Sequence, residues 1–142
     1  MNVEHILQTK GGTVQTVSAD APVSDAVRLL KTHRIGAVVV TDAAGRVAGI
    51  LSERDIVRQL DGNPADLLSA PVRNSMTARV ITASPSDSIE DMMEKMTAHR
   101  IRHLPVVNAG KLVGIISIGD VVKLKIEQAE FEAKALKDYI AS

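Results

Sequence analysis

The sequence predicts an α+β fold in which two pseudo-symmetric β-α-β-β-α repeats pack together and a C-terminal helix follows them. Three observations point to this fold class. The segment Thr32–Ile35 recurs 66 residues later as Ala98–Ile101, and Gly49–Asp55 recurs 65 residues later as Gly114–Asp120. Each copy first carries apolar residues at helical spacing, and two short β-branched runs follow. At 142 residues the chain can bury a core without disulfides or structural zinc, for which it has no Cys.

One amphipathic helix is expected in each repeat, after a short strand. The apolar positions follow the spacing i, i+3, i+4, i+7 and are Val23, Ala26, Val27 and Leu30 in the first repeat and Ile89, Met92, Met93 and Met96 in the second. Ser88–Asp91 resembles a capping box, so we expect the second of these helices to begin there.

A hairpin and a second helix complete each repeat. The β-branched runs are Ala37–Thr41 and Val47–Leu51, then Leu104–Val107 and Leu112–Ile116, and a Gly-containing turn joins each pair. Helical spacing resumes from Ile56 and from Val121, and Asp61–Pro64 breaks the helix between the repeats. Repeats of about 50 to 60 residues are marginal as independent folds, so we expect the two to share a core. The predicted organisation is an N-terminal segment (1–12), a first repeat (13–60), a linker (61–76), a second repeat (77–124) and a C-terminal helix (125–142).

The last helix carries an apolar seam. Neither Gly nor Pro occurs between Asp120 and Ser142, and apolar residues recur there at spacings of three and four, at Ile126, Ala129, Ala133, Leu136 and Ile140. A seam of about two heptads with two Ala would be a weak dimer contact on its own, and packing back on the repeats is a competing use. The two aromatic residues of the chain, Phe131 and Tyr139, also lie on this helix, where they indicate packing or dimerisation.

Charge and composition exclude several classes of protein. The 17 basic residues balance 17 acidic ones, so no long-range field favours a polyanion and we expect no nucleic acid partner. No apolar run approaches the ~18 residues of a membrane span, and Met1–Ile6 lacks the basic start of a secretion signal, so we expect a cytoplasmic protein without membrane contact. The absence of Cys rules out thiol chemistry and iron–sulfur clusters. We expect no metal site, because a strand beginning near Leu104 breaks the helical register of His99 and His103.

The most informative feature is the segment Gly-x-x-Ser-x-x-Asp at a predicted strand-to-helix junction, which occurs twice. One interpretation is structural: Ser52 and Ser117 begin capping boxes and satisfy free N–H groups. The other is a nucleotide site, because a hydroxyl beside helix N–H groups suits an anion, while the carboxylate of Asp55 or Asp120 suits a ribose diol. The residues alone leave both interpretations open.

Residues 13–60 and 77–124 resemble the CBS domain, which is named after cystathionine β-synthase. The resemblance rests on the repeat pattern, on the His-Arg-Ile segment before each hairpin and on the Gly-x-x-Ser-x-x-Asp motif that follows it. Met76–Thr77 also resembles the lead-in common before a second copy. A tandem pair of this kind is called a Bateman module, and the chain is similar to its stand-alone bacterial members. The resemblance implies a regulatory, energy- or redox-sensing protein. It would bind AMP, ADP or ATP, or in some cases NAD(H) or S-adenosylmethionine, in clefts between the repeats, form a homodimer, and regulate an unknown protein.

The resemblance also implies the ligand residues, with each site combining the motif of one repeat and a strand Thr of the other. The first candidate site contains Thr16, Gly36, Ala37, Arg100, Ile115, Ser117 and Asp120. The second candidate site contains Arg34, Ile50, Ser52, Asp55, Thr82, Arg102 and His103. By resemblance, the Asp residues hold ribose hydroxyls, the Ser residues hold sugar or phosphate, the Arg residues hold phosphate, and the two Ile residues form the wall beside the base. Because Gly36–Ala37 is small and Arg102–His103 is bulky and basic, we expect the Asp120 site to be the better mononucleotide site.

Two other function classes are alternatives. An enzyme is disfavoured because no Cys nucleophile, metal cluster or Ser-His-Asp order occurs, so we expect no catalytic residues and no catalytic cofactor. A protein-interaction or structural dimer module with unoccupied clefts would use Ser52 and Ser117 only as caps. If a base binds, it must lie between aliphatic side chains, since no Phe, Tyr or Trp precedes position 131.

Overall fold

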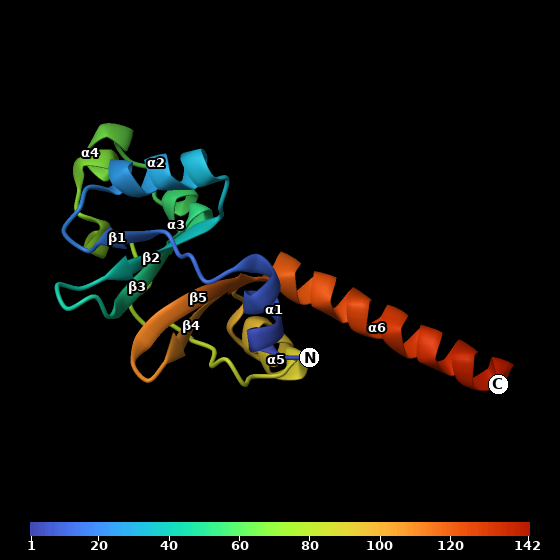
Figure 1. Cartoon of the computed structure of the whole chain (residues 1–142). Helices are drawn as coiled ribbons and strands as arrows, with labels where there is room; N and C mark the ends of the chain where they lie inside the picture. Colours follow the sequence, from blue (N-terminus) through green and yellow to red (C-terminus); the bar gives the residue numbers. More distant parts are fainter. The chain divides into compact units, whose positions relative to one another are not determined.

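A computed structural model describes all 142 residues, and the chain divides into two compact units (Figure 1). The repeat-1 unit comprises Thr13–Ile81 and Ala109–Leu112. The repeat-2 unit comprises Met1–Gly12, Thr82–Asn108 and Val113–Ser142. The mixed α+β class and the two predicted repeats are confirmed.

The repeat-1 unit contains a three-stranded sheet with the order β1-β2-β3. Its elements are β1 (Thr16–Ser18), α2 (Val23–His33), β2 (Ala37–Thr41), β3 (Val47–Ser52), α3 (Glu53–Arg58), α4 (Pro64–Ser69) and the 3-10 turn η1 (Val72–Asn74). Strands β1 and β2 are parallel and joined through α2, whereas β2 and β3 form the predicted antiparallel hairpin. The predicted helix over Val23–Leu30 is confirmed, and it ends in a left-handed residue, Arg34.

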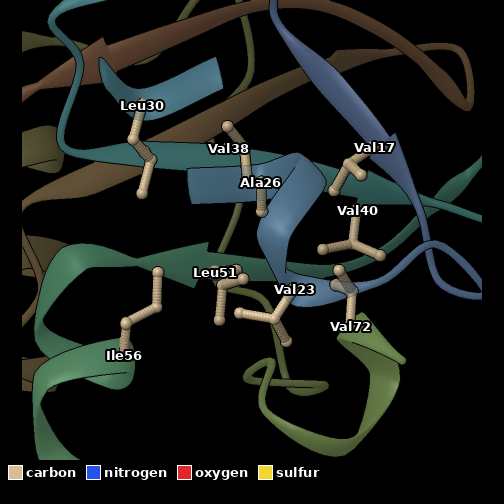
Figure 2. Close-up of a cluster of buried hydrophobic side chains, with 9 residues drawn as sticks. All are labelled: Val17, Val23, Ala26, Leu30, Val38, Val40, Leu51, Ile56 and Val72. Carbon is tan, nitrogen blue, oxygen red and sulfur yellow. The ribbon is translucent and has the colours of Figure 1, made fainter. Parts of the chain in front are cut away.

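The core of the repeat-1 unit is aliphatic and lies between α2, the sheet and η1 (Figure 2). Its buried members are Val17, Val23, Ala26, Leu30, Val38, Val40, Leu51, Ile56 and Val72. Three of the four apolar positions that predicted helix α2 point into this cluster, as the helical period requires. Burial of each of the larger side chains in this cluster stabilises the unit by about 1.5–3 kcal/mol.

The repeat-2 unit contains α1 (Val3–Lys10), α5 (Ile89–His99), β4 (His103–Asn108) and α6 (Ile118–Ala141). It also contains β5 (Lys111–Ser117) from Val113 onward, and β4 and β5 form a hairpin. The expected first strand of this repeat is wrong, because it is reduced to a single parallel bridge between Ala83 and Val106. In the repeat-1 unit the N–H of Val39 donates to the carbonyl of Gln15. The residue equivalent to Val39 is Pro105, which has no N–H, so the second copy cannot extend the ladder in this direction.

Each unit is completed by the segment that precedes the other repeat in sequence. Helix α1 lies in the repeat-2 unit, where Val3 is fully buried and its N–H donates to the carbonyl of Asp87 at 2.9 Å. The linker before the second repeat lies in the repeat-1 unit, where Val72 is fully buried and its N–H donates to the carbonyl of Ala21 at 2.8 Å. Sequence reasoning had left 1–12 outside the repeats and did not anticipate α4 or η1.

Helix α1 and the linker that holds η1 are called the lead-in segments below. Two equivalent glycines allow them to approach the hairpins. A Cβ on Gly49 would lie 2.5 Å from Met76 Sδ and 2.8 Å from the backbone oxygen of Thr77. A Cβ on Gly114 would lie 2.5 Å from a methyl carbon of Leu7 on α1. The first glycine of the repeated motif therefore serves backbone packing in both copies.

Helix α6 continues without a break from the second repeat into the predicted C-terminal helix. Only Val121 and Leu124 are buried on it, whereas Ile126, Leu136 and Ile140 are more than half exposed. Its C-terminal half extends away from α1 and α5, the other helices of its unit (Figure 1). The competing prediction, that the seam packs back on the repeats, is wrong in this structure. No helix combines the length and apolar character needed to cross a lipid bilayer.

Candidate functional site

The motif of the first repeat forms a capping box at the start of α3. Ser52 is the N-cap, and its Oγ accepts a hydrogen bond from the N–H of Asp55 at 3.2 Å. The Oδ2 atom of Asp55 in turn accepts from the Ser52 N–H at 2.9 Å and from its Oγ at 3.0 Å. Asp55 is half-buried, and both of these hydrogen bonds go to the same carboxylate oxygen. The structural interpretation of Ser52 is therefore confirmed, and the cap uses one carboxylate oxygen of Asp55.

The motif of the second repeat reproduces this geometry at the start of α6. Ser117 Oγ accepts from the N–H of Asp120 at 3.3 Å, and Asp120 Oδ2 accepts from the Ser117 N–H and Oγ at 2.9 and 3.0 Å. These distances agree with those of the first motif within 0.1 Å. The two copies therefore hold the serine hydroxyl and the carboxylate in one common local arrangement.

Each motif is joined by a backbone hydrogen bond to the segment that follows the His-Arg-Ile sequence of its own repeat. The N–H of Glu53 donates to the carbonyl of Gly36 at 3.0 Å. In the second repeat, the N–H of Ile118 donates to the carbonyl of Arg102 at 2.8 Å. Ala37 also lies directly opposite Ser52 in the sheet register. Positions 34–37 and 100–103 are thus fixed beside the motif of the same repeat.

The two candidate phosphate ligands share a strained backbone conformation. Arg34 ends α2 and Arg100 ends α5, each in the left-handed region with φ near 53°. A non-glycine residue there costs about 1–2 kcal/mol, and such strain is concentrated at functional sites. Both side chains are exposed, so their guanidinium groups can meet a ligand.

The remaining predicted residues lie in the two units as follows. The repeat-1 unit holds Thr16, exposed on β1, and Ile50, half-buried on β3. The repeat-2 unit holds Thr82, Arg102, His103 and Ile115, of which Arg102 is exposed and the others are half-buried. In the repeat-1 unit, β2 lies between β1, which carries Thr16, and β3, which ends at Ser52. The predicted pairing of each Thr with the motif of the other repeat stays a prediction.

One residue at the second motif was missed by sequence reasoning. Lys10, the last residue of α1, places its Nζ 2.6 Å from Asp120 Oδ2. Burial alone raises the pKa of Asp120, but the hydrogen bonds from Lys10 and Ser117 and the Lys10 charge outweigh it and hold the pKa below its usual range. The two partners lie 110 residues apart in sequence, so no local pattern links them. No lysine or arginine forms an ion pair with Asp55 at the first motif.

Comparisons with known proteins agree with this geometry. The CBS domain family pattern matches residues 3–62 and 72–127. A mitochondrial CBS domain-containing protein of Arabidopsis thaliana, CBSX3, is 32% identical over 146 residues, which cover 97% of this chain and 71% of the relative. The crystal structure of the CBS-domain containing protein ATU1752 from Agrobacterium tumefaciens has a TM-score of 0.83 at 45% identity and covers 87% of this chain and 92% of that one.

Two further similar structures contain adenosine-based ligands. The CBS domain protein PAE2072 from Pyrobaculum aerophilum, complexed with AMP, has a TM-score of 0.74 at 30% identity, covering 84% of this chain and 89% of that one. The CBS domain pair of protein MJ0100, in complex with 5′-methylthioadenosine and S-adenosyl-L-methionine, has a TM-score of 0.79 at 26% identity, covering 90% and 98%. With two matched copies over most of its length, the chain belongs to the CBS domain family, as a tandem pair of CBS repeats.

Proposed function

We propose that this chain is a regulatory module without catalytic activity that binds an adenine nucleotide through its two Gly-x-x-Ser-x-x-Asp motifs. The observation that carries the proposal is the duplicated Ser–Asp arrangement, in which the capping hydrogen bonds of each half-buried carboxylate use only its Oδ2 atom. AMP, ADP and ATP are the expected ligands, and NAD(H) shares the same adenosine half. The AMP complex of one similar protein supports this ligand class.

The chemistry of the motif suits both ends of a nucleoside phosphate. A carboxylate accepts hydrogen bonds and so prefers the two hydroxyl donors of a ribose, while Arg34 and Arg100 offer donors that match phosphate oxygens. Ile50 and Ile115 are half-buried and aliphatic, so they can contact a base without stacking. Such contacts depend on shape and burial, and we expect modest affinity with weak discrimination among adenine ligands.

The test compares motif variants with a capping control. Asp91 closes a capping box with Ser88 at the start of α5, with the corresponding hydrogen bonds at 2.9 and 3.0 Å, but it lies outside both motifs. Calorimetric titration with AMP should show lost affinity for Asp55→Ala or Asp120→Ala and unchanged affinity for Asp91→Ala. Equal affinities in all three variants would show that the motif carboxylates act only as caps.

The competing function is an interaction module whose Ser52 and Ser117 only cap helices. Its support is the complete capping boxes themselves. Thermal unfolding with AMP, ATP, NAD and NADH separates the two functions, because a ligand at a hundred times its dissociation constant stabilises the folded protein by about 2.7 kcal/mol. If none of the four ligands shifts the transition, the nucleotide proposal fails and the interaction module is favoured.

We also propose that the chain forms a homodimer through the seam of α6. The seam residues recur every three or four positions and are exposed, and burying them against a second copy would remove apolar surface from water. Light scattering at micromolar concentration should report a dimer that Leu136→Lys disrupts. Ala135→Lys adds the same charge away from the seam and should leave the dimer intact, and a monomeric wild-type protein would contradict the proposal.

A further inference from the structure

The two motifs differ in one charged contact, which comes from α1. Lys10 Nζ lies 2.6 Å from Asp120 Oδ2, and both side chains are partly accessible, at 33% and 22% exposed. Three donors therefore converge on Oδ2, namely Lys10 Nζ and the N–H and Oγ of Ser117. In the repeat-1 unit, Met76 takes the place of Leu7 beside the motif glycine. Arg79 follows Met76 at the spacing at which Lys10 follows Leu7, and it is exposed.

The ammonium group has capacity beyond this ion pair. Lysine carries three N–H donors, and the structure gives Lys10 one hydrogen bond, to Asp120. The pair also offsets the carboxylate charge, which would otherwise repel an anionic ligand. Asp55 forms no such ion pair with a lysine, and the cation nearest to it in sequence is its neighbour Arg54.

We propose that Lys10 is a specificity-determining residue of the second motif, which makes this motif select adenosine ligands that carry a phosphate over neutral or cationic ones. The inference rests on the proposed function, since it needs an adenosine ligand at Asp120. It concerns the Asp120 motif alone, where AMP or another phosphorylated ligand is the expected preference. Neutral 5′-methylthioadenosine and cationic S-adenosylmethionine are the discriminating ligands, because they share the adenosine group and lack a phosphate.

The test measures ligand preference in an Asp55→Ala background, which leaves the second motif as the proposed binding site. Calorimetry with AMP and with 5′-methylthioadenosine is done on this protein and on versions that also carry Lys10→Met, Lys10→Arg or Lys123→Met. Lys123 is an exposed lysine on α6 without an ion pair, so it controls for the loss of one positive charge from the same unit. Lys10→Arg keeps the charge and tests rescue.

The expected result is a change in the ratio of the two affinities. Lys10→Met should weaken AMP binding about five- to tenfold, the effect of one charge across several Å at a partly exposed site, and change 5′-methylthioadenosine binding by less than about twofold. Lys10→Arg and Lys123→Met should keep the ratio of the parent protein.

If Lys10→Met weakens the binding of both ligands equally, Lys10 only anchors α1 and the inference is overturned. If the parent protein binds neither ligand while the wild-type chain binds AMP, the second motif is not the site and this inference fails alone. If the wild-type chain binds neither, the proposed function fails with it.

Discussion

The capping boxes at Ser52–Asp55 and Ser117–Asp120 are nearly identical, yet their surroundings differ. Both serines cap a helix, and both carboxylates accept a hydrogen bond from the serine N–H at 2.9 Å. At the second motif Lys10 forms an ion pair with Asp120, while the first motif carries Arg54 next to Asp55 in sequence and has no lysine paired with its carboxylate. Duplication has therefore kept the backbone chemistry of the two repeats, and the segments packed beside them have made the two motifs electrostatically different.

The lead-in segments show a second kind of equivalence. Helix α1 precedes the first repeat and completes the repeat-2 unit, whereas the linker that holds η1 precedes the second repeat and completes the repeat-1 unit. Each unit thus contains a piece of chain from outside its own repeat. Neither unit therefore takes its whole core from one continuous segment of the chain.

The largest expected effect tests this exchange of segments. Val3 on α1 and Val72 in η1 are both fully buried and are the same residue type, one in each lead-in segment. Truncating either to Ala should lower the free energy of unfolding by about 2 kcal/mol, through lost apolar burial and the cavity left behind. Chemical denaturation measures both losses. If Val3→Ala costs less than about 0.5 kcal/mol, α1 is not part of the repeat-2 core.

A smaller and unequal effect is expected at the two motif glycines. Gly49→Ala would push a methyl group against the backbone oxygen of Thr77, which cannot move without shifting the linker, so we expect a loss of about 1–3 kcal/mol. Gly114→Ala would meet the end of the Leu7 side chain, which can rotate away, so the loss should be below about 1 kcal/mol. Thermal unfolding of the two variants gives the order. The reverse order would show that α1 packs more rigidly than the linker.

The smallest effect is the pH dependence of the Lys10–Asp120 pair. Because the folded-state pKa of Asp120 is lowered, its contribution to stability is present above the unfolded value of about 4 and is lost as the pH falls through the folded value. Lys10 is the main group that opposes the effect of burial on the pKa of Asp120. Lys10→Met should therefore lower the free energy of unfolding by about 0.5–1 kcal/mol near neutral pH, and this loss should shrink in acid. Urea denaturation at several pH values checks this trend. A difference that grows on acidification would contradict the ion pair.

Much of the fold was predictable because its signals are local. The apolar period around Val23–Leu30 and the capping box at Ser88–Asp91 depend on residues within one or two turns, and both predicted helices occur. The lost strand near Ala83 depends on Pro105 across the sheet, so only its pairing partner reveals it. The capping role of Ser52 and Ser117 was likewise readable from four residues.

The charged partner of the second motif was not predictable by the same means. Lys10 meets Asp120 only because α1 packs in the repeat-2 unit, and nothing near Lys10 in sequence identifies that unit. The seam of α6 is an intermediate case. Its period was readable from Ile126 to Ile140, but whether it packs on the repeats depends on tertiary contacts, and the structure leaves it exposed.

The central claim is that Asp55 and Asp120 hold an adenine nucleotide, and counting bound AMP tests it most directly. Native mass spectrometry of the folded protein in the presence of AMP reports the number of ligands per chain. The account predicts bound AMP on the wild-type protein and on Asp91→Ala, less on Asp55→Ala or Asp120→Ala, and none on the double variant of the two motif residues. A double variant that binds as much AMP as the wild-type protein would contradict the account.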